Sequence, residues 1–196
     1  MNYDLAVITQ RSEPIVSTAE AKLHLRVETD MNDDDLLIAS LVTAASNYCE
    51  MYTRRTVLET SYKMVFDTFP YTKGLFYLPR SPLVSLDQIQ YYDEDGTLQT
   101  LSTDIYIVGQ GISSPARIAL APDEEWPDTE AGRIEAVEVT FSSGEDVARD
   151  TFKAAIKLLV GHWYENRESV IIGATPAQVP QTVNMILDGE KITEVP

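Results

Sequence analysis

The sequence predicts an α+β chain of one domain, in which a small antiparallel helical bundle carries an inserted antiparallel β lobe. Apolar residues recur at helical spacing over about 17–55 and again over about 150–187. Between these segments, over about 57–145, short runs of alternating apolar and polar residues are separated by turn residues. Short connections between the runs favour antiparallel pairing. Residues 1–16 and 188–196 show no clear period and are expected to form arms.

Two helices are predicted before the β lobe. Ser17 and Glu20 have capping-box spacing, which predicts a short helix from about Thr18 to Leu25. After an acidic turn, Asp33 is expected to cap a longer second helix. Its apolar residues share one face, which we expect to be a core face: Leu37, Leu41, Ala44, Ala45, Tyr48, Met51 and Tyr52.

The β lobe begins where alternation replaces helical spacing, at Tyr62, Met64 and Phe66. Further candidate strands are Leu75–Leu78, Val84–Tyr92, Thr97–Leu101, Ile105–Val108, Arg117–Leu120 and Ala136–Phe141. The segment "YYDEDGTL" predicts a hairpin, because a short loop ending in Gly96 joins two β-prone runs.

A third helix is predicted over about 150–169, followed by a short helix that starts at Pro180. The apolar stripe of the third helix must meet another stripe, and the second helix offers one. The residues expected to pack the bundle are therefore Leu37, Leu41, Tyr48 and Tyr52 from the early segment, with Phe152, Ile156, Leu159 and Trp163 from the late one.

The formal charge of −16 comes from 31 acidic and 15 basic residues, and it argues against binding to nucleic acid through phosphates. Such a charge suits solubility, a surface past which nucleic acid slides, or a DNA mimic that binds the basic cleft of another protein. No apolar run is long enough to cross a membrane, and the first residues lack a signal-peptide pattern. The single cysteine, Cys49, fits a packing role in a reducing cytoplasm.

The segment "GHWYENRESV" at 161–170 is the strongest candidate for chemistry. His162 and Glu165 are neighbours on a helix surface and define an alternative hypothesis, a hydrolase or metal site. Asn166 stands where an inverted zinc-protease motif needs its second histidine, and HExxH is absent. We expect packing in this segment, and no catalytic residue, cofactor or metal.

Three other segments contain residues with candidate roles. "DMNDDD" places Asp35 where a calcium loop needs glycine, and "GQGISS" lacks the third glycine of a dinucleotide fingerprint. Trp126, in the acidic loop "EEWPD", is either an interface anchor or a side chain folded back over the β lobe.

Four segments resemble the head-tail connector (adaptor or head-completion) proteins of long-tailed bacteriophages and prophages. They are "EAKLHLRVETDMNDDDLLIASLVTAASNYCEMYTRR" at 20–55, "LPRSPLVSLDQIQYYDEDGT" at 78–97, "WP" at 126–127 before "AVEVTFSSG", and "AAIKLLVGHWYENRESV" at 154–170. They follow the family's order over most of the chain. The C-terminal "ILDGEKITEVP" departs from the family's short, basic-ended helix.

The resemblance implies a structural protein of the virion, placed at the capsid-tail junction after assembly in the bacterial host cytoplasm. Its implied partners are further copies of itself in a ring of about twelve subunits, the portal protein and tail-side completion proteins, with genomic DNA passing through and no membrane. An acidic channel would repel phosphates; Asp33 to Asp35 and Glu165 to Glu168 are the candidates for it. A closed ring needs two different contact patches, for which Tyr71, Tyr91, Trp126 and Arg167 are candidates.

Overall fold

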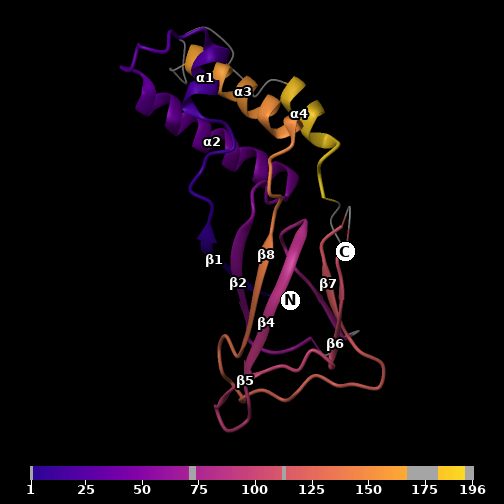
Figure 1. The fold of residues 1–196 in the computed structure, drawn as a ribbon. Coiled ribbons are helices and arrows are strands. Elements are labelled where there is room, and N and C mark those ends of the chain that lie inside the picture. The colour runs from indigo at the N-terminus through magenta and orange to yellow at the C-terminus, as the bar shows by residue number, and fades with distance from the viewer. Residues whose placement is uncertain (1, 71–73, 112–113, 167–180, 193–196) are drawn as a thin grey trace, which may run out of the picture. The chain divides into compact units, whose positions relative to one another are not determined.

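The computed structural model of the chain describes residues 2–70, 74–111, 114–166 and 181–192. These residues divide into two compact units (Figure 1). The β unit is formed by 2–11, 58–146 and Ile192, and the helical unit by 12–57 and 147–191 within the described ranges. Residues 58–146 of the β unit are therefore inserted between helices in the sequence, whereas 2–11 precede the first helix and Ile192 follows the last. The predicted α+β class with antiparallel sheets is confirmed.

The helical unit contains α1 (Thr18–Leu25), α2 (Asp35–Thr53), α3 (Asp150–Glu165) and α4 (Gln181–Asp188). Helix α2 contacts the other three, and α3 also contacts α1 and α4. Segments from both ends of the sequence thus share one apolar core.

The capping box predicted at α1 is present. The Ser17 hydroxyl accepts from the Glu20 N–H at 3.2 Å, and the Ser17 N–H donates to Glu20 Oε2 at 3.0 Å. This backbone hydrogen bond lowers the pKa of the Glu20 carboxyl below its ordinary value. Helix α1 therefore starts where its local sequence predicts.

Buried Lys22 fixes the turn between α1 and α2. Its Nζ donates to Thr29 O at 3.1 Å and lies 2.9 Å from Asp35 Oδ1 and 3.4 Å from Asn32 Oδ1. Its side chain is only 5% exposed, so the amino group is removed from water and depends on these oxygens.

Helix α2 differs from expectation at its start and on its core face. Its N-cap is Asp34, not Asp33, and this side chain makes no capping hydrogen bond because it accepts from the Tyr164 hydroxyl of α3. Its fully buried side chains are Ile38, Val42, Ala45, Cys49 and Thr53. The predicted Leu37, Leu41, Tyr48 and Tyr52 are half-buried, and Ala44 and Met51 are exposed. The core face is therefore centred about one residue further along.

The two tyrosines of that predicted face contact α4. Tyr48 donates through its hydroxyl to Asn184 Oδ1 at 3.0 Å, and Tyr52 donates to Asp188 Oδ1 at 2.6 Å. In α3 the structure buries Phe152, Ile156 and Leu159 and leaves Trp163 half-buried. Helix α3 ends at Glu165 and is followed by its C-cap Asn166, short of the predicted end near 169; residues 167–169 lie outside the described residues.

The β unit contains β1 (Asp4–Gln10), β2 (Thr60–Phe66), β3 (Leu75–Tyr77), β4 (Leu83–Tyr92), β5 (Leu98–Thr100), β6 (Tyr106–Gly109), β7 (Arg117–Leu120) and β8 (Val137–Ser143). They form one sheet in the order β1-β2-β8-β4-β5 and another in the order β3-β7-β6, with every neighbouring pair antiparallel. The predicted hairpin is β4-β5, with Gly96 at φ +74° in its loop.

The core of the β unit lies between its two sheets. In β2 the alternate residues Tyr62, Met64 and Phe66 are buried, and they pair across with Phe141, Val139 and Val137 of β8. Phe76 of β3 and Ile118 of β7 belong to the same buried cluster. The rings of Phe66 and Phe76 lie 5.3 Å apart, so the two sheets share one aromatic and aliphatic core.

The expectation of an N-terminal arm over 1–16 is wrong. Asp4–Gln10 forms β1, an edge strand paired with β2, and Ser17 already caps α1. In β1 only Leu5 is half-buried, so the strand depends on hydrogen bonding to β2 more than on burial. Of the predicted C-terminal arm, Glu190 is half-buried and Ile192 is buried, while 193–196 lie outside the described residues.

Candidate interaction sites

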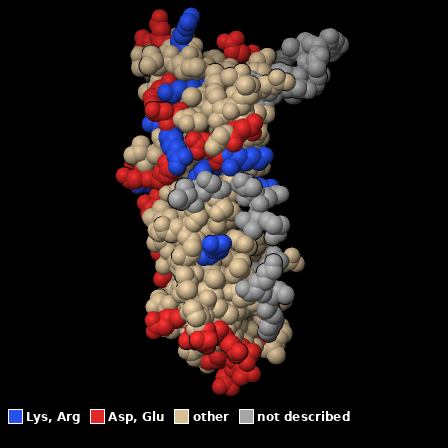
Figure 2. Space-filling model, turned by 90° about the vertical axis from the view of Figure 1, so that its right-hand side faces the viewer, with Lys and Arg blue, Asp and Glu red and all other residues tan. Residues whose placement is uncertain are grey.

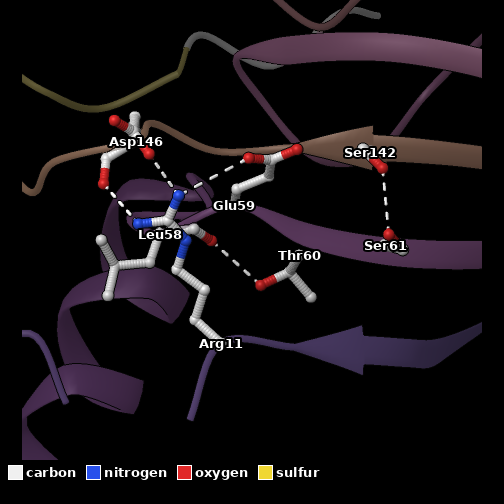
Figure 3. A network of polar contacts seen from close by, with 7 residues as sticks. All are labelled: Arg11, Leu58, Glu59, Thr60, Ser61, Ser142 and Asp146. Atoms are coloured by element: carbon white, nitrogen blue, oxygen red, sulfur yellow. Dashed lines mark hydrogen bonds and ion pairs between the residues drawn. The ribbon is translucent and has the colours of Figure 1, made fainter. Parts of the chain in front are cut away.

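A polar cluster in the β unit centres on Arg11 (Figure 3). Arg11 Nη1 donates to Asp146 O at 2.7 Å, and Nη2 forms an ion pair with the Asp146 carboxylate. The same nitrogen lies 3.8 Å from Glu59 Oε2. These three residues stand at or next to three of the four positions where the chain passes between the units, after Arg11, before Leu58 and after Asp146. The cluster therefore holds the crossing segments of the β unit together.

Backbone contacts also join the segments around Leu58 and Glu145, next to the Arg11 cluster. Glu59 N donates to Glu145 O at 3.1 Å, and Leu58 forms a parallel bridge with Glu145. Gly144 has φ +120°, and a Cβ there would lie 2.6 Å from Leu58 C and O. Only glycine allows both this conformation and this approach. The Ser61 and Ser142 hydroxyls, 3.0 Å apart, extend the contact along β2 and β8 (Figure 3).

A second cluster occurs in the helical unit. Glu190 Oε2 lies 2.8 Å from Arg149 Nη1, and Arg55 Nε donates to Glu190 O at 2.5 Å. Each stands near one of the four crossings: Arg55 lies three residues before Leu58, Arg149 three residues after Asp146, and Glu190 two residues before Ile192. The Glu190 side chain is 14% exposed and that of Arg55 is 9% exposed, so these charges depend strongly on each other.

The chemical candidates His162 and Glu165 lie three residues apart on α3. His162 is half-buried on α3 and Glu165 is exposed at its end; among the described residues no hydrogen bond or ion pair joins their side chains. His24 of α1 lies near Gly161, so the second histidine also borders α3. Within the described ranges, no group of three or more His, Cys, Asp or Glu residues is arranged to hold a metal ion.

Cys49 is completely buried in α2, and burial raises the pKa of its thiol to about 12. At neutral pH the group is therefore a protonated thiol. This state suits packing and disfavours nucleophilic chemistry.

The predicted contact residues of the β unit are less exposed than expected. Trp126 stacks on Phe69 with ring centroids 4.9 Å apart and an interplanar angle of 1°, and Tyr91 meets Phe69 edge-on at 5.9 Å. Trp126 is thus folded back over the β lobe, as one of the two sequence alternatives held. Tyr71 and Arg167 lie outside the described residues.

Acidic loops border this aromatic group. Figure 2 shows Asp and Glu gathered at the lower end of the view, which in Figure 1 is the end of the β unit carrying the β4-β5 loop. From 93 to 130 the sequence has one basic residue, Arg117, and nine acidic residues: Asp93, Glu94, Asp95, Asp104, Asp123, Glu124, Glu125, Asp128 and Glu130. This end of the β unit is strongly anionic.

Sequence reasoning missed both ion clusters. Arg11 and Asp146 are 135 residues apart, as are Arg55 and Glu190. No local pattern indicates such pairs. The available signal was weak: charged residues of opposite sign stand near predicted element boundaries, where chain crossings occur.

The sequence family follows from residues 17–116, which match the model of the phage gp6-like head-tail connector protein family. These residues are half of the chain and run from the α1 capping box to the start of β7. The chain belongs to this family. The resemblance found from the four sequence segments is therefore confirmed.

Solved structures with the same fold come from the neck and virion of gene transfer agent (GTA) particles. A chain from the neck of the empty particle, computed with C6 symmetry, matches with a TM-score of 0.79 and 19% identity, covering 98% of this chain and 97% of that one. A chain from the native virion matches with a TM-score of 0.76 and 20% identity, covering 97% and 96%. A chain from the native neck, computed with C12 symmetry, has a TM-score of 0.76 and 18% identity, covering 98% and 97%.

No curated protein matches the sequence. None of the helices in the described part of the chain has the length and apolar character needed to span a bilayer.

Proposed function

We propose that this chain is a structural subunit that forms a ring at the capsid-tail junction of a phage-like particle, bound to the portal on one side and to tail-side completion proteins on the other. The observation that carries the proposal is the match to the head-tail connector family. The shared fold with neck chains over nearly the whole length adds support, since one of those necks was computed with C12 symmetry. A ring of about twelve subunits would follow from the same symmetry.

The internal construction of both units suits a structural role in a particle. Each unit is closed at its chain crossings by its own ion cluster, around Arg11 in one and Glu190 in the other. Rigid units present fixed surfaces, and a ring needs two different patches held in fixed register. In the helical unit, the buried residues Phe152, Ile156 and Leu159 of α3 would keep the surface of the bundle fixed.

Genomic DNA would pass through the ring without specific binding. A net charge of −16 repels phosphates, so an anionic channel would not trap the genome. Of the acidic residues proposed from the sequence to face the channel, Asp34 accepts from Tyr164 and Asp35 pairs with Lys22. Asp33, Glu165 and the acidic loops of the β unit are exposed and are better placed to contribute negative charge to the channel, and Glu168 lies outside the described residues.

The ring is tested by measuring mass in solution over a range of concentrations, with and without purified cognate portal, and by negative-stain imaging of the same samples. We expect rings with a central hole, formed by the concentrated protein or on the portal. A chain that stays monomeric at the highest concentration and also in the presence of the portal would contradict the proposal.

Passage of DNA is tested separately. Fluorescence anisotropy with a labelled duplex at low salt should show no binding by the ring, because low salt strengthens any phosphate contact. Tight, salt-sensitive binding would contradict an open anionic channel.

A further inference from the structure

A cavity of about 330 Å³ opens in the β unit beside the stacked pair Phe69 and Trp126. Pro70, Leu120 and Pro127 complete its apolar wall. All of these residues belong to the β unit, so the site is formed within a single subunit. The volume is at the lower end of the range for ligand pockets, and it fits one or two side chains of a peptide.

One residue of the wall, Trp126, carries a buried hydrogen-bond donor. No acceptor for its Nε1 is found among the described residues. A buried indole N–H normally has a partner. A carbonyl oxygen brought in by a ligand is the kind of group that would satisfy it.

The polar part of the wall is acidic. Glu125 and Asp128 line the cavity, and exposed Asp123 and Glu124 precede it in the same loop. Glu130 is paired with Arg133 at 2.8 Å, whereas no ion pair joins Glu125 or Asp128 to a described residue. The cavity therefore presents negative charge beside an apolar floor, and it disfavours phosphate or any other anion.

We propose that this cavity is a docking site for a short extended segment of another protein, in which an apolar side chain is flanked by Lys or Arg. The apolar side chain would pack on Phe69 and Trp126, a backbone carbonyl would accept from the Trp126 indole, and the basic side chain would pair with Glu125 and Asp128. Aromatic pockets with a charged edge are typical anchor sites of protein interfaces. The proposal goes beyond ring formation and does not depend on it, because one subunit supplies the whole cavity.

The test uses the ¹⁵N-labelled full chain and capped pentapeptides with Leu, Phe or Pro at the centre and Lys, Gln or Glu at the flanks. The chain has two tryptophans, Trp126 and Trp163, so its spectrum has two indole N–H signals, and Trp163→Phe assigns them. We expect Lys-flanked peptides to shift the Trp126 signal saturably and to leave that of Trp163 unchanged. Glu-flanked peptides with the same centre should bind at least tenfold more weakly.

Matched variants distinguish binding in the cavity from a general attraction of basic peptides to the acidic end of the β unit. The double variant Glu125→Gln with Asp128→Asn should weaken the Lys-flanked peptides at least tenfold. The double variant Glu94→Gln with Asp95→Asn removes the same charge from the exposed β4-β5 loop, outside the cavity, and should change binding less than twofold.

Three results would overturn the proposal. One is the absence of a saturable Trp126 shift with every peptide of the set, and another is equal binding of Lys-flanked and Glu-flanked peptides. The third is a Trp126 signal that moves with protein concentration alone, which would assign the cavity to a second copy of this chain.

Discussion

Arg149 Nη1 lies 2.8 Å from Glu190 Oε2, and the Glu190 backbone carbonyl accepts from Arg55. One acidic residue thus joins three segments of the helical unit close to where each crosses to the β unit. The cluster of the β unit has a basic residue at its centre, Arg11, which contacts Asp146 and Glu59. Each unit therefore has its own ion cluster near its chain crossings, with an acidic central residue in the helical unit and a basic one in the β unit.

Glu190→Gln should destabilise the helical unit by about 1–3 kcal/mol, because it removes the negative charge of a largely buried carboxylate that lies 2.8 Å from Arg149 Nη1 and 3.7 Å from Arg55 Nε. The free energy of unfolding is measured by urea titration, following Trp163 fluorescence in a Trp126→Phe background. Glu165→Gln removes the same group from an exposed position and should change stability by less than about 0.5 kcal/mol. Equal effects of the two variants would show that the Glu190 cluster contributes nothing specific.

Gly144→Ala should destabilise the β unit more than Gly132→Ala does. Both glycines have positive φ, +120° and +77°, but only at Gly144 would the new Cβ meet backbone, 2.6 Å from Leu58. We expect Gly144→Ala to cost about 1–3 kcal/mol more, the usual range for overpacking. Urea unfolding followed through Trp126 in a Trp163→Phe background measures the difference. A difference of zero would mean that the close approach of Gly144 and Leu58 is not maintained.

Cys49 should be inert in the folded protein. With a pKa of about 12 and no exposed surface, the thiol carries almost no thiolate at pH 8. Reaction with a disulfide reagent such as Ellman's reagent should be slow in buffer and fast in denaturing urea. Rapid labelling of folded protein would place Cys49 outside the core.

The α1 capping box should make stability depend on pH. The pKa of Glu20 is lowered from its ordinary 4.5, so its stabilisation is complete above about 4.5 and is lost as the pH falls through the folded value. The stability difference between the native chain and Glu20→Gln should therefore be constant from pH 8 to 5 and shrink below pH 4.5.

Ser17→Ala gives the matching control for the capping box. It removes the side-chain cap at every pH and should cost about 1 kcal/mol. Its cost should depend on pH less than that of Glu20→Gln, because the backbone N–H of Ser17 still donates to the Glu20 carboxylate after the hydroxyl is lost. If the stability difference caused by Glu20→Gln were independent of pH, the carboxylate would not be the group that matters.

Local signals account for the parts of the fold that the sequence predicts well. The Ser17 and Glu20 spacing places α1 within its observed bounds, and the alternation of Tyr62, Met64 and Phe66 identifies β2 and its core face. Gly96 marks the β4-β5 hairpin. In each case the residues that decide the structure are neighbours in the chain.

Long-range contacts account for the parts of the fold that the sequence predicts poorly. Strand β1 carries no clean alternation because it is an edge strand exposed on both faces, and its pairing with β2 bridges more than fifty residues of sequence. The face of α2 was misplaced because Tyr48 and Tyr52 are bound by polar side chains of α4. The Arg11 and Glu190 clusters join residues with no local relation. The cavity beside Trp126 likewise depends on the packing of separate loops.

The proposed ring would be visible in intact particles that carry this chain. Cryo-electron microscopy of such particles, reconstructed around the junction of capsid and tail, provides the decisive measurement. We expect a closed ring of copies between portal and tail, with the helical and β units of each copy resolved. Finding the chain in the capsid shell or along the tail, or as a single copy at the junction, would contradict it.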